Sequence, residues 1–311
     1  MGRYLARRLL LLLPVALGIT IVAFFLLRLI PGDPAVIMLD NRATAENVAR
    51  LRHQLGLDRP LSVQYLLFLR NIVTGQLGDS LVYRSAVLPI IAGHLPVTLF
   101  LAVYAIVLAA ILAIPLGIWA ALRKNRAPDH AIRLGVLVSL ATPSYWIAIV
   151  FLLVFSIHLR WFPVGGYGET FVDHLRHLFL PAMTIAISLS PILVRTLRHN
   201  ILEVLRQDYV RTARAKGLRG GVVFVRHVLR NSLVSTVSVL GVYLGFLVGG
   251  AVVTETVYAI PGTGYLLIKS TFGRDYPMVQ GLTLTFATLV ILVNLLTDLT
   301  YAFLDPRVRY E

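Results

Sequence analysis

The sequence predicts an all-α membrane protein with six transmembrane helices, and three observations support this fold class. Of its 311 residues, 57% are hydrophobic and only 14% are charged, and the mean hydropathy is +0.78. A soluble domain is about 45–50% apolar and about 25% charged, so the composition argues against a soluble or a disordered chain. Six long stretches contain no Asp, Glu, Lys or Arg, and basic residues gather in alternate segments between them.

Each of the six stretches can cross a bilayer as a helix. The hydrocarbon core is about 30 Å thick and a helix rises about 1.5 Å per residue, so a span needs roughly 20 apolar residues. The fourth stretch, with 17 residues, is the shortest. In chain order the predicted spans are Leu9–Leu27, Leu95–Leu122, Leu134–Ile157, Leu178–Val194, Asn231–Thr254 and Pro277–Thr297.

The first span and the segment after it form a predicted N-terminal region, residues 1–94. Arg3, Arg7 and Arg8 precede the span as in a signal peptide, but the apolar run is long for one and no Ala-x-Ala-like cleavage site follows. We therefore expect a retained helix. The outer loop of 64 residues that follows contains amphipathic segments at 48–57 and 61–73, which predict a partly helical extracytoplasmic region.

The remaining residues, 95–311, form a predicted core of five helices with one long inner loop, 195–230. The side with excess Lys and Arg usually stays cytoplasmic. With the N-terminus inside, the inner segments hold 18 basic and five acidic residues, whereas the outer segments hold ten and nine. Both termini are therefore expected in the cytoplasm, and the asymmetry accounts for the net charge of +14 without a nucleic-acid partner.

The fifth span carries three glycines at intervals of four residues, Gly241, Gly245 and Gly249. Small residues on one face let helix backbones approach closely in lipid. The pattern predicts helix packing or a subunit interface, and it leaves open whether the partner helix belongs to this chain or to another subunit.

Ionisable groups are nearly absent from the spans, so a membrane enzyme is disfavoured and no catalytic residue is predicted. Asp298, with Asn294 one turn earlier, is the exception. We favour a structural role for Asp298 near the inner end of its helix, while a proton relay in a stand-alone secondary transporter is the alternative class. His174 and His177 form a pair without a third ligand, so no metal site is predicted.

The chain also lacks the loop with which ATPases hold phosphates. A Walker A motif ends in Gly-Lys followed by Ser or Thr, and no Gly-Lys dipeptide occurs in the sequence. If ATP drives a process here, a separate chain must hydrolyse it.

The inner loop contains the most informative segment, residues 203–218, which predicts a short amphipathic helix on the cytoplasmic face. Helical spacing places four residues on one face: Leu202, Leu205, Tyr209 and Ala213. Arg206, Arg211 and Arg214 point elsewhere, and Gly217 is the expected helix end. Two interpretations are equally compatible with this composition. The helix docks a soluble partner, or it rests on anionic lipid, which attracts each Arg by about 1 kcal/mol.

This segment resembles the EAA-type coupling segment of permeases from binding-protein-dependent ABC importers, in the form of the dipeptide, oligopeptide and nickel group. The match covers Asp208–Leu218 and His227–Asn231. Other motifs of the group occur in order over essentially the whole chain: Arg7-Arg8, Pro31-Gly32-Asp33-Pro34, Leu55-Gly56-Leu57-Asp58, Gln64-Tyr65, Gly78-Asp79-Ser80, Glu255-Thr256-Val257, Pro261-Gly262-Thr263-Gly264, Arg274-Asp275-Tyr276-Pro277 and Asp305-Pro306-Arg307. The chain resembles the first of the group's two permease subunits.

The resemblance implies a type I ABC importer permease fold in a bacterial inner membrane. It implies as partners a second homologous permease, two cytoplasmic ATPase subunits, an extracytoplasmic solute-binding protein and the lipid bilayer. ATP and Mg would be bound by the ATPase subunits, and this chain would hold no cofactor. The implied solute is a short peptide, with nickel, glutathione, opines and oligosaccharides left open.

The resemblance also assigns roles to individual residues. Contact with the ATPase is implied for Asp208, Tyr209, Arg211, Thr212, Ala213, Arg214, Ala215, Lys216 and Gly217. Within this set Ala213 and Gly217 would be small for close approach. The general motif has Glu-Ala-Ala where this chain has Arg211-Thr212-Ala213, so a glutamate-based contact is not expected. Contact with the solute-binding protein is a further expectation for Glu255, Pro261, Gly262, Arg274, Asp275 and Tyr276.

Overall fold

The computed structural model describes residues 2–29, 36, 43–54 and 56–304, and in this part of the chain the regular structure is helical, with one isolated bridge between Asp79 and Ala86. The PGDP motif at 31–34 and the Asp-Pro-Arg motif at 305–307 lie outside the described residues. The chain divides into two compact units, and each unit is built from separate stretches of sequence.

The first unit comprises residues 1–95 and 266–291. It contains α1 (Gly2–Leu29), α3 (Ala45–Gln54), α4 (Leu61–Val73), the start of α5 (Val87–Leu122), most of α12 (Thr263–Phe272) and the first half of α13 (Tyr276–Leu304). The predicted amphipathic segments of the outer loop correspond to α3 and α4. Phe24 of α1 packs against Tyr65 and Phe68 of α4, with ring centroids 5.3 and 5.6 Å apart, so this loop folds back on the first helix.

The core of the first unit joins the start of α5 to α12 and α13. Its buried side chains are Val87, Ile91, Leu266, Met278 and Leu282. Gly281 of α13 faces this cluster, and a Cβ there would lie 2.7 Å from Cγ1 of Val87. Two helices can pack this closely only where one of them has no side chain.

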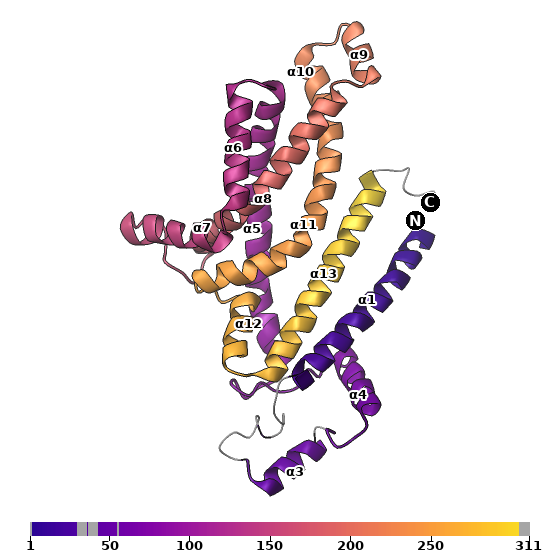
Figure 1. The fold of residues 1–311 in the computed structure, drawn as a ribbon, viewed down its shortest axis with the longest axis vertical. Coiled ribbons are helices and arrows are strands. Elements are labelled where there is room, and N and C mark those ends of the chain that lie inside the picture. Colours follow the sequence, from indigo (N-terminus) through magenta and orange to yellow (C-terminus); the bar gives the residue numbers. More distant parts are fainter. Residues whose placement is uncertain (1, 30–35, 37–42, 55, 305–311) are drawn as a thin grey trace. The chain divides into compact units, whose positions relative to one another are not determined.

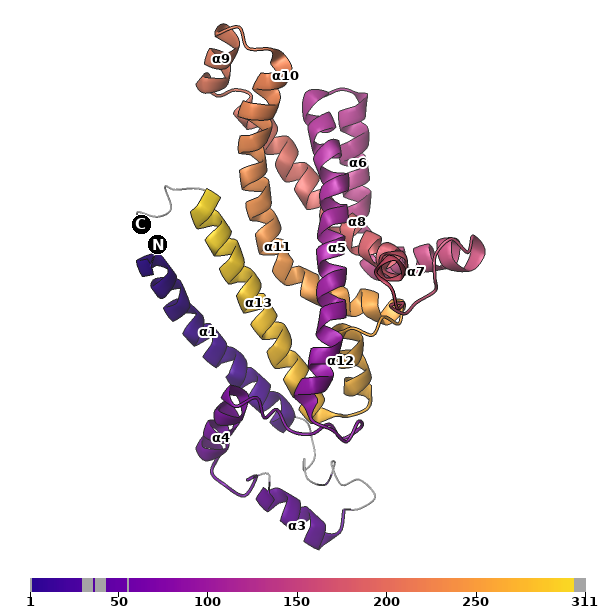
Figure 2. The ribbon, with the colours of Figure 1, turned by 180° about the vertical axis from the view of Figure 1, so that it is seen from behind.

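The second unit comprises residues 96–265 and 292–311. Besides the rest of α5 and α13 and the first turn of α12, it contains α6 (Ala127–Ala141), α7 (Ser144–Phe151), a π-helical segment η2 (Leu152–His158), α8 (Phe171–Val204), α9 (Asp208–Ala215), α10 (Gly220–Val223), a π-helical segment η3 (Phe224–Leu229) and α11 (Arg230–Val257). In this unit α8 packs against α6, α7 and α11 (Figures 1 and 2).

Small residues let α5 and α8 share one core. On α5, Ala105, Ala109 and Ala113 recur every fourth residue and are buried. They face the same cluster as buried residues of α8 such as Ala182 and Ala186. The stripe of alanines allows close approach of the helices in lipid, where packing rather than water exclusion drives association.

The predicted third span, Leu134–Ile157, is not one straight helix. The pair formed by α6 and α7 with η2 bends by 98°, at residues 142–143. Thr142 is extended, with φ −91° and ψ 124°, because a following proline disfavours the helical conformation. Pro143 is the N-cap of α7, a position at which a helix does not need the backbone N–H that proline lacks.

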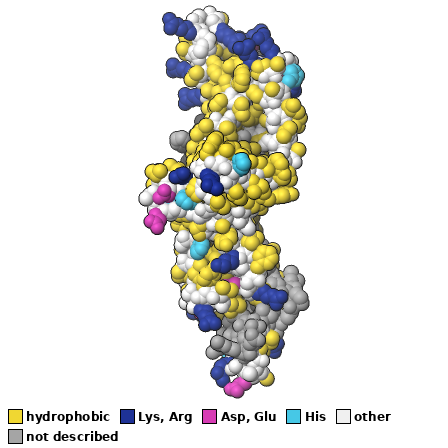
Figure 3. All heavy atoms as spheres, turned by 90° about the vertical axis from the view of Figure 1, so that its left-hand side faces the viewer, with side chains coloured by type: hydrophobic (Ala, Val, Ile, Leu, Met, Phe, Trp, Pro, Cys, Tyr) yellow, Lys and Arg dark blue, Asp and Glu magenta, His cyan; other side chains and the backbone are white. Residues whose placement is uncertain are grey.

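The remaining predicted spans all fall within helices. Three of these helices are long and apolar enough to cross a membrane among the described residues, namely α5, α8 and α13 up to Thr297, and the bent pair would make a fourth. The described apolar part of α1, Leu10–Phe25, is shorter than a span. Figure 3 shows a broad hydrophobic surface on the second unit, with Lys and Arg gathered at the end that carries α9.

Candidate functional site

The helix α9 (Asp208–Ala215) stands between α8 and α10, at one end of the second unit (Figure 1). The helix stops at Ala215, and Gly217, the predicted stop residue, follows two positions later with φ +78°. The N–H of Gly217 donates to the carbonyl oxygen of Arg214 at 2.9 Å, and the N–H of Leu218 donates to that of Ala213 at 3.4 Å. This pair of bonds is a Schellman motif, which needs a left-handed residue and so favours glycine.

One face of α9 is buried against the rest of its unit. Val210 is 0% exposed and Ala213 is 6% exposed. They belong to one apolar cluster, called here the α9 anchor, which also contains Ala121 of α5, Leu197 and Ile201 of α8, Val223 of α10 and Val228 of η3.

The predicted apolar face of this segment was partly wrong. Tyr209 is 43% exposed, and Val210 takes the buried position instead. The prediction assumed one continuous helix, but α8 ends at Val204 and α9 begins at Asp208, so the helical phase restarts between them. Tyr209 has a different contact, because its hydroxyl accepts a hydrogen bond from Nδ2 of Asn231 at 3.0 Å. That bond ties α9 to the start of α11.

The opposite face of α9 and the turn after it are exposed and charged. The exposed residues are Asp208, Arg211, Thr212, Arg214, Ala215, Lys216 and Gly217. Three cations and one carboxylate give this face a net charge of +2. The Arg211 Nη1 lies 3.6 Å from Oδ1 of Asp208, a surface pair that contributes little to stability. The face is therefore free to contact another molecule.

Ala213 and Gly217, the two residues expected to be small for close approach, differ in what surrounds them. Ala213 lies in the α9 anchor, so its small side chain brings α9 close to its own chain and contact with an ATPase is not its role here. Gly217 is exposed, and nothing lies within 4 Å of the position that a Cβ would occupy.

Glu255 is fully buried and organises the start of α12. One carboxylate oxygen accepts a hydrogen bond from Oγ1 of Thr98 at 2.7 Å, and the other accepts from the N–H groups of Gly264 and Tyr265 at 2.7 and 3.0 Å. A Cβ at Gly262 would overlap the Glu255 carboxyl group. The expected contact of Glu255 and Gly262 with a binding protein is therefore corrected, since the motif encodes a buried helix cap.

Asp275 has the equivalent role in the first unit. It is buried, and its carboxylate accepts hydrogen bonds from the hydroxyl of Ser80 and from the N–H groups of Leu81, Val82 and Met278. Asp275 thus caps α13 and holds the loop before α5, which again corrects the expected contact. Pro261 and Arg274 are exposed and Tyr276 is partly exposed, so the expectation for these three stays untested.

The glycines of α11 have different surroundings. Gly241 is buried, and a Cβ there would overlap the side chain of Thr297 on α13, so at this position the close partner belongs to the same unit. Gly249 is exposed and has nothing within 4 Å of a Cβ position. The surroundings of Gly245 and the side chain of Asp298 lie outside what the structure describes.

Two sequence models of one kind of transport protein match nearly the whole chain. The binding-protein-dependent transport system inner membrane component matches residues 113–310, and the N-terminal part of such membrane components matches residues 1–102. The chain belongs to this family of inner membrane transport components.

Relatives of this transport component match over its full length. It is 38% identical to the oligopeptide transport system permease protein AppB of Bacillus subtilis, over 100% of both chains. It is 39% identical to the di/tripeptide transport system permease protein DppB of Pseudomonas aeruginosa and 36% identical to the dipeptide transport system permease protein DppB of Alkalihalophilus pseudofirmus, each over 99% of both chains.

Solved structures share the fold of this component. An inward-facing form of the MetNI methionine ABC transporter superposes with a TM-score of 0.59 at 14% identity, over 70% of this chain and 96% of that one. An amino acid ABC transporter gives 0.51 at 16% identity, over 69% and 94%. The chain is thus a membrane-embedded part of a binding-protein-dependent ABC system rather than an enzyme, and such a system also contains an ATPase and a solute-binding protein.

One buried ion pair of this component was missed by the sequence analysis. Asp129, at the start of α6, is fully buried and accepts hydrogen bonds from Nε and Nη2 of Arg198 on α8, both at 2.7 Å. The N–H of Asn125 donates to the same carboxylate at 2.8 Å. In the sequence, Asp129 is a single acid among four basic residues of an inner loop. This pattern does not identify its partner Arg198, because Arg198 lies 69 residues later in the chain.

Proposed function

We propose that this chain is the permease subunit of an ATP-driven importer and forms half of a translocation path for short peptides. The observation that supports this proposal most is α9, a short helix with one face fixed in the core and a charged face exposed. The solute class is proposed from relatives that are named as oligopeptide, dipeptide and di/tripeptide permeases along their full length.

The proposed topology has six spans and both termini in the cytoplasm of a bacterium, with α9 facing the cytoplasm. The asymmetric distribution of basic residues supports this orientation, since 18 of them fall in the segments assigned to the inside. The helices that cover the predicted spans support the number, with the bent pair of α6 and α7 counted as one.

The proposed assembly contains this chain, a second homologous permease, two ATPase subunits that bind ATP and Mg, and a solute-binding protein outside. This chain holds no cofactor in the proposal. The exposed residues of α9 enter a cleft of one ATPase subunit, where Arg211 and Arg214 meet acidic or polar groups.

The α9 anchor provides a mechanical route from this contact to the membrane helices. Because Val210 and Ala213 share one buried cluster with Leu197 of α8 and Val228 of η3, a displacement of α9 would be passed on to α8 and η3. ATP can drive the change only because the ATPase binds α9 differently in its two states. Wide π-helical turns such as η3 are frequent at functional sites.

Reconstitution tests this proposal. The chain is co-expressed with its second permease and ATPase subunits, purified, and placed in proteoliposomes with the solute-binding protein and a labelled dipeptide. We expect uptake that requires ATP, and hydrolysis that rises when the peptide-loaded binding protein is added. The variant with both Arg211→Glu and Arg214→Glu should lose uptake by at least about tenfold, because like charges then face the cleft.

The matched control is Arg219→Glu, an exposed arginine outside α9. It should keep uptake near the unmodified level. Uptake that persists without ATP and follows a proton gradient would contradict the importer and favour a secondary transporter. ATP-dependent uptake of a different solute would contradict only the substrate class.

A further inference from the structure

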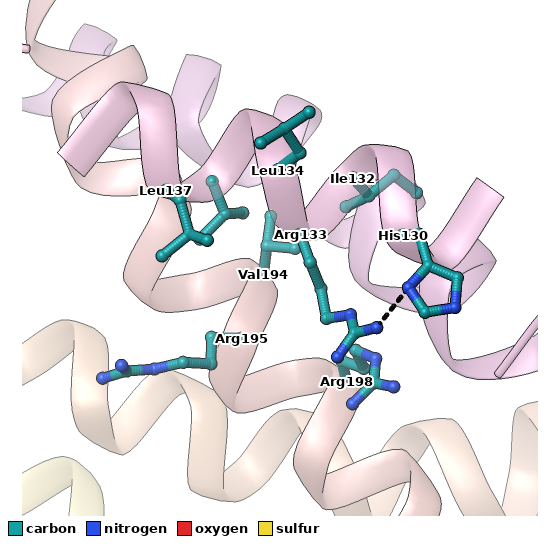
Figure 4. A pocket seen from close by; sticks show the side chains of 9 residues that line it. His130, Ile132, Arg133, Leu134, Leu137, Val194, Arg195 and Arg198 are labelled. Carbon is teal, nitrogen blue, oxygen red and sulfur yellow. Dashed lines mark hydrogen bonds between the residues drawn. The ribbon is translucent and has the colours of Figure 1, made fainter. Parts of the chain in front are cut away.

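A cavity of about 360 Å³ lies between α6 and α8 within the second unit (Figure 4). Its size falls in the range of about 300–1,000 Å³ that is typical of sites for small molecules. It is lined by Ile132, Leu134, Val136, Leu137 and Val194, which are apolar, and by His130, Arg133, Arg195 and Arg198. Nothing in the proposed coupling mechanism uses it.

The cavity carries an excess of positive charge. Arg198 is paired with Asp129 at 2.7 Å, and the Nε of Arg133 lies 3.7 Å from the same carboxylate. Arg133 also donates to Nδ1 of His130 at 2.6 Å. Arg195 is exposed and has no hydrogen-bonding or ionic partner among the described residues. Asp129 thus faces two of the three guanidinium groups that line the cavity, and Arg195 extends away from these two (Figure 4). The three guanidinium groups and the one carboxylate leave a net charge of +2, which favours an anion.

The apolar part of the cavity opens onto the hydrophobic surface of α6. Leu134 and Leu137 line the cavity and are 62% and 63% exposed, and Val138 beside them is 58% exposed. Apolar side chains exposed on a membrane protein are more stable against hydrocarbon than against water. A free inorganic anion would leave them without a partner, whereas an amphiphile would cover them with its chain.

We propose that this cavity binds one anionic phospholipid, with the phosphate beside Arg195 and Arg198 and an acyl chain along Leu134 and Leu137. Basic pockets between membrane helices hold anionic headgroups through charge and hydrogen bonds, while the chain covers apolar side chains. The proposal requires that the chain is embedded in a membrane and is independent of the transported solute.

Native mass spectrometry of the purified transporter complex tests the site. The complex is delipidated in mild non-ionic detergent and titrated with phosphatidylglycerol, and phosphatidylcholine serves as the zwitterionic comparison. Binding of phosphatidylglycerol should be tighter. Arg195→Gln should weaken it by about fivefold, since each basic residue contributes about that factor to attraction of an anionic lipid. Because Arg195 has no described partner, its replacement leaves the ion pair of Asp129 intact.

Two controls separate this site from general attraction and from a site for a free anion. Arg123→Gln removes an exposed arginine that does not line the cavity and should leave the affinity unchanged. Leu137→Asn should weaken phosphatidylglycerol binding, and inorganic phosphate should not displace the lipid. Equal losses for both arginine variants, equal binding of the two lipids, or displacement by phosphate would each overturn the proposal. The same titration on the chain purified alone would test the lipid site even if no ATPase subunit accompanied it.

Discussion

A single left-handed backbone position determines where the candidate coupling helix ends. Gly217 makes the Schellman motif possible with φ +78°, a conformation that costs other L-residues roughly 1–2 kcal/mol. Its surroundings are open, so a larger side chain would meet no steric obstacle within this chain. Any effect of replacing Gly217 must therefore act through the backbone or through a partner.

Replacing Gly217 by valine and by asparagine distinguishes the two possibilities. Asparagine tolerates the left-handed conformation far better than a β-branched residue. If the backbone matters, Gly217→Val should assemble in the membrane yet uncouple ATP hydrolysis from uptake, while Gly217→Asn should keep most of the uptake. The measurement is the ratio of peptide taken up to ATP hydrolysed in proteoliposomes. Equal loss in both variants would indicate that the partner needs the bare glycine surface.

As an element, α9 projects from its unit because only one of its faces packs against the rest of that unit. Its eight residues are too few to form a stable helix alone, so its stability comes from tertiary packing. The α9 anchor supplies that packing through one buried face, and the other face carries the charges. A helix of this kind can pass a movement to its neighbours only if its buried face stays packed against them.

Two alanines of α9 provide a matched test of the attachment. Ala213→Leu should lower the free energy of unfolding by about 1–3 kcal/mol, because additional methyl groups overpack a filled site. Ala215→Leu adds the same atoms on the exposed face and should change it by less than about 0.5 kcal/mol. Thermal unfolding of the purified complex in detergent measures both. Equal stability of the two variants would mean that α9 is not anchored through Ala213.

The orientation of the whole molecule in the membrane can be measured by labelling single introduced cysteines, because the sequence contains no cysteine of its own. Lys216→Cys and Glu169→Cys introduce single thiols at exposed positions. With both termini inside, a membrane-impermeant maleimide should label Glu169→Cys in right-side-out vesicles and Lys216→Cys only in inside-out vesicles. The reverse pattern would contradict the proposed topology.

The elements of this molecule were largely predictable, because long apolar runs without charges form helices in lipid. The end of α9 was predictable because glycine adopts the left-handed conformation more readily than other residues. The break before Pro143 had a local signal in the proline, although the hydrophobic run concealed it.

Long-range partners could not be predicted from spacing. Glu255 and Asp275 belong to polar motifs that suggest exposure, yet each is buried as a helix cap. Their partners Thr98 and Ser80 lie 157 and 195 residues earlier in the sequence. Tyr209 was misassigned because a one-residue change in helical phase moves a side chain to another face.

The buried carboxylates of Glu255 and Asp275 also determine when, during synthesis of the chain, their hydrogen bonds can form. Ser80 and Thr98 leave the ribosome well before Asp275 and Glu255, because a chain is synthesised from its N-terminus. The buried hydrogen bonds of Glu255 and Asp275 therefore cannot form in either unit until the later part of the chain has been translated and inserted. A nascent chain that stops before residue 255 therefore leaves unfinished surfaces in both units, and premature products would be recognisable to proteases as incomplete.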